Sequence, residues 1–166
     1  DVVTMDHSIL KPEDKSRHGD RVSLGMQDIP TRYLACYPGK SKSSAEVQKA
    51  CKHFFGLGKP GVVYTDGSQE FKHAFASLGY NADTATPFRP QTNGIAERSM
   101  RRIREGISCL LDQAGFHTLW WAEAARCYCF LRNVSDKVKN GVTAYELRHG
   151  KEFPGKYVEF GRHVEY

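Results

Sequence analysis

Three acidic side chains in this sequence have the type and setting needed for chemistry. Asp6 ends the β-prone stretch VVTM, Asp66 follows the apolar stretch GVVYT, and Glu97 lies in the first turn of a helix-like run. None stands beside a nucleophile and a general base, so the pairing that triad chemistry requires is missing. Carboxylate oxygens are, however, the ligands that Mg²⁺ prefers. Two such ions, ~4 Å apart, stabilise the attacking and leaving oxygens when a phosphodiester is displaced in line.

Each of these acids also has a simpler interpretation when it is taken alone. Asp66 precedes a glycine, a pair that is typical of turns, and acids near helix starts are often caps. Asp1 and Asp28 are rival candidates for the first carboxylate. Asp28 follows a strand-like stretch next to Ile29-Pro30, which favours a role in the turn. The metal interpretation therefore requires a fold that brings distant acids together.

The segment around Glu97 is strongly basic. Five arginines and this single acid lie between residues 89 and 104, in a chain with a net charge of +5 and a pI near 9.0. At ~100° per residue, Glu97 shares a helical stripe with Arg101, Arg104 and Ser108. Arginines on that stripe would contact the phosphates of a nucleic acid without reading its sequence. The alternative is an ordinary ion pair between Glu97 and Arg101, worth only ~0.5 kcal/mol.

The hydrophobic pattern predicts the elements that must position these residues. Strand-like stretches at 2–5, 21–27 and 31–37 predict a three-stranded antiparallel meander. The apolar GVVYT predicts a buried parallel strand, and a further strand is expected around 80–85. With helices between them, the order β-β-β-α-β-α-β-α-α predicts an α/β protein. Its mixed five-stranded sheet should carry helices on both faces.

Apolar residues at helical spacing predict the helices themselves. The first covers 47–54 and ends at Gly56, and a brief second covers 71–78. The fourth, 118–133, is apolar on both sides, so it is either central to the core or an oligomer contact. A short helical piece is expected in TAYELRHG. The third helix, of about six turns, has a predicted buried side made of Met100, Ile103, Ile107, Leu110 and Ala114.

Several common functions find no support in the sequence. The longest apolar runs are too short for a membrane span, and no signal peptide is visible at the start. Gly-Lys-Ser at 39–41 imitates the end of a P-loop, but Leu34 stands where that loop needs a glycine. We interpret it as a solvated turn. No G-x-S-x-G elbow and no H-E-x-x-H motif is present, so serine hydrolase and zinc protease activities are not expected.

The cysteines indicate the cellular compartment of the protein, and its length indicates the number of domains. The five cysteines are odd in number and show no C-x-x-C spacing, which favours reduced thiols in an intracellular compartment. A zinc site at Cys127 and Cys129 is not expected, because a one-residue gap on a helix points the thiols apart. The 166 residues suffice for one domain. The abrupt ends at Asp1 and Tyr166 lead us to expect a domain of a longer protein.

Segments that contain the three acids occur in an order that resembles a known family. They are VTMDHS, VVYTDGSQEF and TPFRPQTNGIAER, followed by LWWAEAARCYCFLRN and TAYELRHGKE. Together they resemble the catalytic core of retrotransposon and retroviral integrases, the D,D,E family with a ribonuclease H-like fold. The resemblance is greatest to integrases of the copia type.

This resemblance implies roles for individual residues. Asp6, Asp66 and Glu97 would be the catalytic acids that bind two Mg²⁺ or Mn²⁺ ions. Residues 91–94 would form the mobile active-site loop. DNA contacts would come from basic and amide side chains in and after that loop. The candidate DNA-binding residues are Arg89, Gln91, Asn93, Arg98, Arg101 and Arg104.

The resemblance also implies a function, which we state as an expectation with its alternatives. An integrase-type polynucleotidyl transferase would process the 3′ ends of a mobile element and join them to target DNA. Gly67 stands where an Asn often follows the second Asp, so a decayed or repurposed DNA-binding or assembly module is one alternative. A ribonuclease H-like nuclease without strand transfer is the other.

The expected organisation and partners follow from the same resemblance. Residues 1–134 would form the catalytic core, and 135–166 an extension that starts a linker to a following domain. The partners would be the DNA of element ends and target, and further copies of the chain, bound through the 118–133 helix as a homodimer or higher multimer. We expect the protein in a cytoplasmic particle and in the nucleus.

Overall fold

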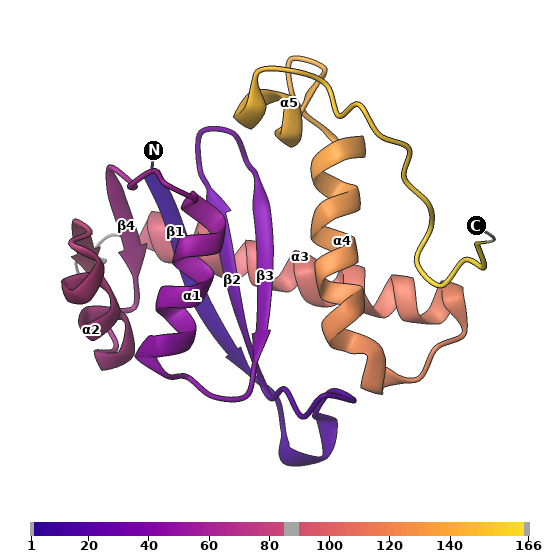
Figure 1. Cartoon of the computed structure of the whole chain (residues 1–166), viewed down its shortest axis with the longest axis horizontal. Coiled ribbons are helices and arrows are strands. Elements are labelled where there is room, and N and C mark those ends of the chain that lie inside the picture. The colour runs from indigo at the N-terminus through magenta and orange to yellow at the C-terminus, as the bar shows by residue number, and fades with distance from the viewer. Residues whose placement is uncertain (1, 85–89, 165–166) are drawn as a thin grey trace.

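The computed structural model describes residues 2–84 and 90–164, the side chains of 84 and 90–93 excepted. Its centre is a five-stranded sheet in the order β3-β2-β1-β4-β5, and a two-stranded sheet lies further along the chain (Figure 1). Within the described range, no helix is long and apolar enough to cross a membrane. The strands of the large sheet are β1 (Val2–Ile9), β2 (Val22–Asp28), β3 (Leu34–Gly39), β4 (Val62–Thr65) and β5 (Ala82–Thr84).

The pairing of these strands confirms the predicted mixed sheet. β1, β2 and β3 form the antiparallel meander, with Met5 opposite Met26 and Met26 opposite Ala35. β4 runs parallel to β1, and β5 runs parallel to β4. The β2–β3 turn is fixed by Asp28, which accepts hydrogen bonds from the backbone N–H of Thr31, at 3.3 Å, and from its hydroxyl.

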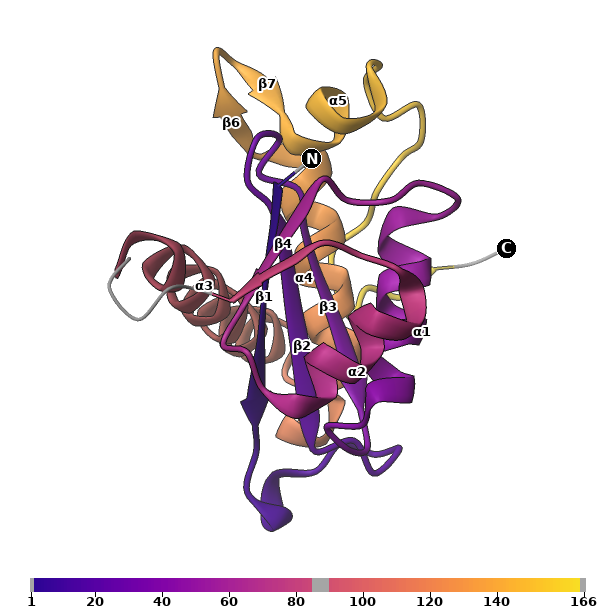
Figure 2. The ribbon, with the colours of Figure 1, turned by 90° about the vertical axis from the view of Figure 1, so that its left-hand side faces the viewer.

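Two helices cover one face of the sheet (Figure 2). They are α1 (Ser44–Phe55) and α2 (Gln69–Leu78), close to the predicted ranges. α1 begins where the hydroxyl of Ser43 accepts a hydrogen bond from the backbone N–H of Glu46 at 3.3 Å, and it ends at Gly56. The core on this face consists of Val3, Met5, Leu24, Met26, Val47, Ala50, Cys51, Phe54, Val63, Phe71, Ala74 and Phe75.

The opposite face is covered by α3 (Pro90–Ala114), and α4 (Trp121–Ser135) packs against α3 and β3. A 3₁₀ turn (Thr118–Trp120) joins the two helices. Met100 and Ile103 are buried as predicted, while Leu110 is only partly covered because Leu111 faces the core. Helices therefore lie on both faces of the sheet, as the sequence predicted.

Two glycines allow close packing on this second face. A methyl group at Gly25 of β2 would lie 2.1 Å from the sulfur of Met100, so α3 rests directly on the strand. A methyl group at Gly106 of α3 would lie 2.2 Å from the ring of Tyr128 in α4. Both positions exclude any larger residue without movement of the neighbouring side chain.

The helix α4 also closes one end of β3, which is an edge strand. The side-chain amide of Asn133 donates to the carbonyl of Leu34 at 2.7 Å and accepts from its N–H at 2.9 Å. At the other end of the strand, Pro38 has no N–H to offer. These features leave little of the edge open to pairing with another strand.

Two sequence-based expectations about boundaries are wrong. Residues 91–94 are helical and do not form a loop, because α3 begins at Pro90, whose fixed φ suits a first helical position. Glu97 therefore lies about two turns inside the helix. Asp6 does not end β1, because β2 continues to pair with that strand as far as Ile9.

The C-terminal part contains a hairpin, β6 (Lys137–Lys139) and β7 (Val142–Thr143), and the short helix α5 (Ala144–His149) expected from the sequence. Arg148 of α5 donates a hydrogen bond to the carbonyl of Phe54 and lies over its ring, 4.2 Å from the centroid. This contact joins α5 to α1. The division of the chain at residues 134 and 135 stays a prediction.

Candidate active site

Strand register brings the first two acids to the same level of the sheet. Parallel pairing sets Val2 opposite Val62 and Thr4 opposite Tyr64. Asp6 lies two residues beyond Thr4, and Asp66 lies two residues beyond Tyr64. β4 ends at Thr65, so Asp66 begins the loop to α2, where its Oδ1 accepts a hydrogen bond from the backbone N–H of Ser68 at 3.0 Å. The turn role and the site position of Asp66 are therefore compatible.

The helix α3 supplies the third acid from the other side of the sheet. Side chains alternate along a strand, so Val3 and Met5 join the core under α1 and α2, whereas Asp6 lies on the side of α3. Two residues after Glu97, the buried hydroxyl of Ser99 hydrogen-bonds the side chain of Gln27 in β2 and the carbonyl of Ile95 at 2.8 Å. This bond fixes the turn of α3 that carries Glu97.

The three carboxylates share one cavity of about 210 Å³. Asp6 is half-buried in it, whereas Asp66 and Glu97 are exposed. They come from a strand, from the loop after a parallel strand and from a helix, so separate elements converge here. The cavity is lined by Thr4, Met5, Asp6, Tyr64, Thr65, Asp66, Ala96 and Glu97.

The electrostatics of this cavity disfavour negative charge on Asp6. Burial raises the pKa of Asp6, and the neighbouring charges of Asp66 and Glu97 raise it further. A hydrogen bond at the His7 backbone and the positive charge of Lys42 act in the opposite direction but do not cancel the rise. A cation bound among the acids would relieve this repulsion.

The donor set fits hard divalent cations in its chemistry. All three groups offer carboxylate oxygens from one open cavity. Among the described residues, however, no three His, Cys, Asp or Glu side chains surround a single point where one ion could bind. The acids thus share a cavity and do not form a closed cage around one position.

A second group of charged residues adjoins the acids. Glu70, in the first turn of α2, holds Lys42 through an ion pair of 2.9 Å between Oε1 and Nζ. The same oxygen lies 3.9 Å from Nδ1 of His7, whose side chain is only 4% exposed and stacks on Phe71. Burial and the charge of Lys42 lower the pKa of His7 to about 4, so this ring is neutral near pH 7.

Sequence reasoning missed this group. It assigned the loop at 39–41 to a solvated turn, and it did not single out the neighbouring Lys42. The partner, Glu70, is distant in sequence and belongs to another element, so no local pattern links the two. The only signal was that Glu70 lies in the segment VVYTDGSQEF together with Asp66.

The predicted DNA-contacting residues are placed only in part. Arg98, Arg101 and Arg104 are exposed on α3. No ion pair joins Glu97 to Arg101 in the part of the chain that the structure describes, so the i, i+4 bridge is wrong. Arg89 lies outside the described residues, as do the side chains of Gln91 and Asn93.

The rival sites do not acquire a chemical role. Asp28 is buried and belongs to the β2–β3 turn through its bonds to Thr31, as the sequence favoured. Asp1 lies outside the described residues. All five cysteines are free thiols, and burial raises the pKa of Cys127 and of Cys129.

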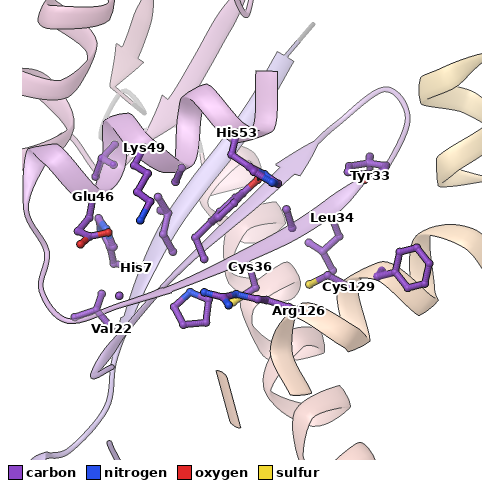
Figure 3. A pocket seen from close by; sticks show the side chains of 18 of the residues that line it. His7, Val22, Tyr33, Leu34, Cys36, Glu46, Lys49, His53, Arg126 and Cys129 are labelled. Carbon is purple, nitrogen blue, oxygen red and sulfur yellow. The ribbon is translucent and has the colours of Figure 1, made fainter. Parts of the chain in front are cut away.

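A larger cavity, of about 470 Å³, lies between β3, α1 and α4 (Figure 3). Apolar groups such as Val22 and Leu34 line much of it, and Glu46, Lys49 and Arg126 are among its charged residues. Its lining includes none of the three candidate acids. The smaller cavity is therefore the candidate active site.

Comparison with known proteins connects the chain to retroelements. No protein-family model matches the sequence. The chain is 37% identical over 78 residues to a retrovirus-related Pol polyprotein of the tobacco transposon TNT 1-94, which covers 47% of this chain and 6% of the relative. It is 28% identical over 149 residues to the retrovirus-related Pol polyprotein of the Drosophila melanogaster transposon 412, and this match covers 86% of the chain and 12% of the relative. The chain thus spans only a small part of these relatives.

Solved structures share the fold. The HTLV-2 integrase catalytic core, solved with magnesium in a trimeric form, matches with a TM-score of 0.68 and 19% identity over 89% of this chain and 95% of that one. The simian T-cell lymphotropic virus intasome, solved with a PP2A regulatory subunit, matches with a TM-score of 0.71 and 18% identity over 99% and 60%. The chain is thus similar in sequence to parts of the retrovirus-related Pol polyproteins of transposons, and it has the ribonuclease H-like fold of a retroviral integrase catalytic core.

Proposed function

We propose that this chain is the catalytic core of an integrase-type polynucleotidyl transferase. It would direct water at a phosphodiester near the end of a mobile element, and the freed 3′-hydroxyl would then attack target DNA. The observation that carries the proposal is the convergence of Asp6, Asp66 and Glu97 on one cavity, where Asp6 is disfavoured as an anion. The narrower expectation of a copia-type element stays a prediction.

The three acids would divide the task of binding two Mg²⁺ or Mn²⁺ ions. Asp6 lies on β1, the central strand of the sheet, so it would serve both ions. Asp66 and Glu97 would each complete the site of one ion. Such sharing needs no single point surrounded by three acids. When bound, the ions would balance the charge that builds on the phosphodiester oxygens during displacement.

Exposed arginines on α3 would hold the DNA beside these acids. Arg98, Arg101 and Arg104 follow Glu97 along the same helix and lack an ion pair among the described residues. Contacts of this kind fix the position of the backbone and carry no base specificity. Arg89 and Gln91, together with Asn93, remain candidates for further contacts.

The proposed setting extends to assembly and location. The likeness to an intasome structure and to a trimeric core supports a multimer on DNA. We place the contact between copies on α4, where Phe130 is 41% exposed and Cys127 half-buried, although Trp121 and Ala125 of the same helix belong to the core. The protein would act in a cytoplasmic particle and in the nucleus.

A joining assay tests the function. End-labelled element DNA is incubated with target DNA and Mn²⁺, and shortened and joined strands are separated by size. We expect both products with the wild type and neither with Asp66→Asn. Asp112→Asn, which changes an exposed acid of α3 outside the cavity, serves as the matched control.

The product pattern also separates the alternatives. Shortened strands without joined strands would identify a nuclease. DNA binding without either product, unaffected by loss of all three acids, would identify a non-catalytic module. Products that persist in Asp66→Asn would refute the assignment of the acids.

A further inference from the structure

A single lysine is held near Asp6, on the side of the sheet away from α3. Lys42 lies in the loop between β3 and α1, and its Nζ is 2.9 Å from Oε1 of Glu70. The lysine side chain is 31% exposed and that of Glu70 only 17%. The same oxygen of Glu70 lies 3.9 Å from Nδ1 of His7, the residue that follows Asp6 on β1. Lys42 therefore belongs to the surroundings of the cavity.

Glu70 is in a position to fix where this lysine lies. Its backbone belongs to the first turn of α2, and Phe71, the next residue, is fully buried. The buried ring of His7 packs on Phe71 and approaches the same carboxylate oxygen. Because this packing holds the carboxylate of Glu70 in place, the ion pair restricts the long, flexible side chain of Lys42, which would otherwise move freely in the loop.

The lysine retains capacity to bind a second anion. An ammonium group has three N–H donors, and Glu70 is the only ion-pair partner of Lys42 among the described residues. The remaining donors are on a side chain that is part-exposed. An ammonium group acts as a point charge and commonly binds a phosphate group through one of its oxygens.

The geometry leads us to propose that Lys42 is a DNA-phosphate contact of the candidate active site and that Glu70 is its positioning residue. This inference rests on the proposed function. Asp6 and His7 are neighbours on β1, and their side chains point to opposite faces of the sheet. Asp6 lies on the face of α3, the helix that carries Arg101 and Arg104. His7 lies on the other face, where Glu70 holds Lys42. A DNA strand at the acids would thus be flanked by cations on both sides, which offsets the repulsion between carboxylates and phosphates.

The salt dependence of DNA binding tests the contact without requiring catalysis. Affinity for a short double-stranded oligonucleotide is measured over a range of salt concentrations in the absence of divalent cations. Each lost phosphate contact lowers the slope of log affinity against log salt by about 0.9. We expect this reduction in Lys42→Ala and recovery in Lys42→Arg. Lys40→Ala, an exposed lysine of the same loop, should leave the slope unchanged.

The positioning role of Glu70 has a separate readout. In Glu70→Gln the lysine keeps its charge but loses its ionic partner. The slope of log affinity against log salt should therefore stay as in the wild type, while the rate at which DNA strands are joined falls. Equal slopes in the wild type and Lys42→Ala would overturn the inference and leave a pair that only ties the loop to α2. Absence of DNA binding by the wild type would overturn it too.

Failure of the inference and failure of the proposed function are distinguishable. An active wild type with an unchanged slope in Lys42→Ala sinks the inference alone. A reduced slope in a protein that neither cuts nor joins DNA supports the phosphate contact and refutes the catalytic proposal.

Discussion

At the scale of single residues, Asp6 has a position that suits function at the expense of stability. It is half-buried on β1 and faces two other acids, so burial and repulsion raise its pKa. Acids placed in this way destabilise a fold near neutral pH, and active sites commonly retain them for their chemistry. The stability of the chain should therefore rise when this charge is removed.

We predict that Asp6→Asn raises the free energy of unfolding at pH 7 by an amount of the order of 1 kcal/mol in metal-free buffer. The folded pKa of Asp6 lies above its ordinary value of 3.8, so the folded state holds this proton more tightly than the unfolded state does. Its contribution to stability is therefore complete below that value and lost as pH rises through the folded pKa. Thermal unfolding from acid to neutral pH measures the difference.

The matched control for this prediction is Asp112→Asn, an exposed acid of α3. It should leave the melting temperature close to that of the wild type over the same pH range. A lower melting temperature for Asp6→Asn at pH 7 would show that the charge of Asp6 is stabilising, in conflict with the repulsion described above.

At the scale of elements, the position of α3 decides whether Glu97 reaches the other acids. This helix rests on β2 at Gly25 and on α4 at Gly106, where neighbouring side chains fill the space that a methyl group would take. Gly94, near the start of the same helix, has no heavy atom of the described residues within 4 Å of the position that a methyl group would take. The absence of a side chain is thus required for packing at Gly25 and Gly106 but not at Gly94.

We predict opposite effects of alanine at two glycines of α3. Gly106→Ala should lower the free energy of unfolding by about 2 kcal/mol, because its methyl group collides with Tyr128. Gly94→Ala should raise it by up to ~1 kcal/mol through better helix propensity. Chemical denaturation measures both values. An unchanged stability in Gly106→Ala would mean that α4 is free to move away from α3.

Local patterns predicted most of the elements but not all of their limits. The helical spacing of apolar residues from Val47 to Phe54 predicted α1, and the continuous apolar run GVVYT predicted β4, because both signals lie between neighbours in sequence. The start of α3 was missed because Pro90 and the Asn93-Gly94 pair favour loops when judged locally. The end of β1 was missed because its last residues, from Asp6 to Ile9, are held by pairing with β2, a contact between strands that the local pattern of these residues does not reveal.

The candidate site was predictable to a similar extent. The three acids were identified from their positions after strand-like stretches and from the family resemblance, and they do line one cavity. The ion pair of Lys42 with Glu70 was not identified, because it joins a loop to a helix that is distant in sequence. Contacts set by tertiary packing leave no periodic signal in the chain.

At the scale of the whole molecule, the proposed assembly depends on the outer side of α4. Phe130 is 41% exposed on this helix and contacts Phe153 of the C-terminal segment, with 5.3 Å between ring centroids. Intramolecular packing therefore covers part of this side and leaves part of it accessible. The remaining apolar surface is the feature that a second copy would cover.

We predict that Phe130→Arg weakens self-association while the melting temperature changes little, because the side chain is partly exposed. Sedimentation equilibrium over a range of protein concentrations measures the association. Leu57→Arg places the same charge at a fully exposed position after α1 and should not alter it. If Phe130→Arg associates as the wild type does, the contact between copies lies elsewhere.

The central claim is that Asp6, Asp66 and Glu97 together bind divalent cations, and the most direct test is a Mn²⁺ titration of thermal stability. This test requires neither DNA nor catalysis. A ligand at 100 times its Kd stabilises the folded state by ≈ 2.7 kcal/mol. The account predicts a rising melting temperature for the wild type and for Asp112→Asn, a reduced rise for Asp66→Asn and Glu97→Gln, and almost none for Asp6→Asn. An equal rise in Asp6→Asn and the wild type would contradict it.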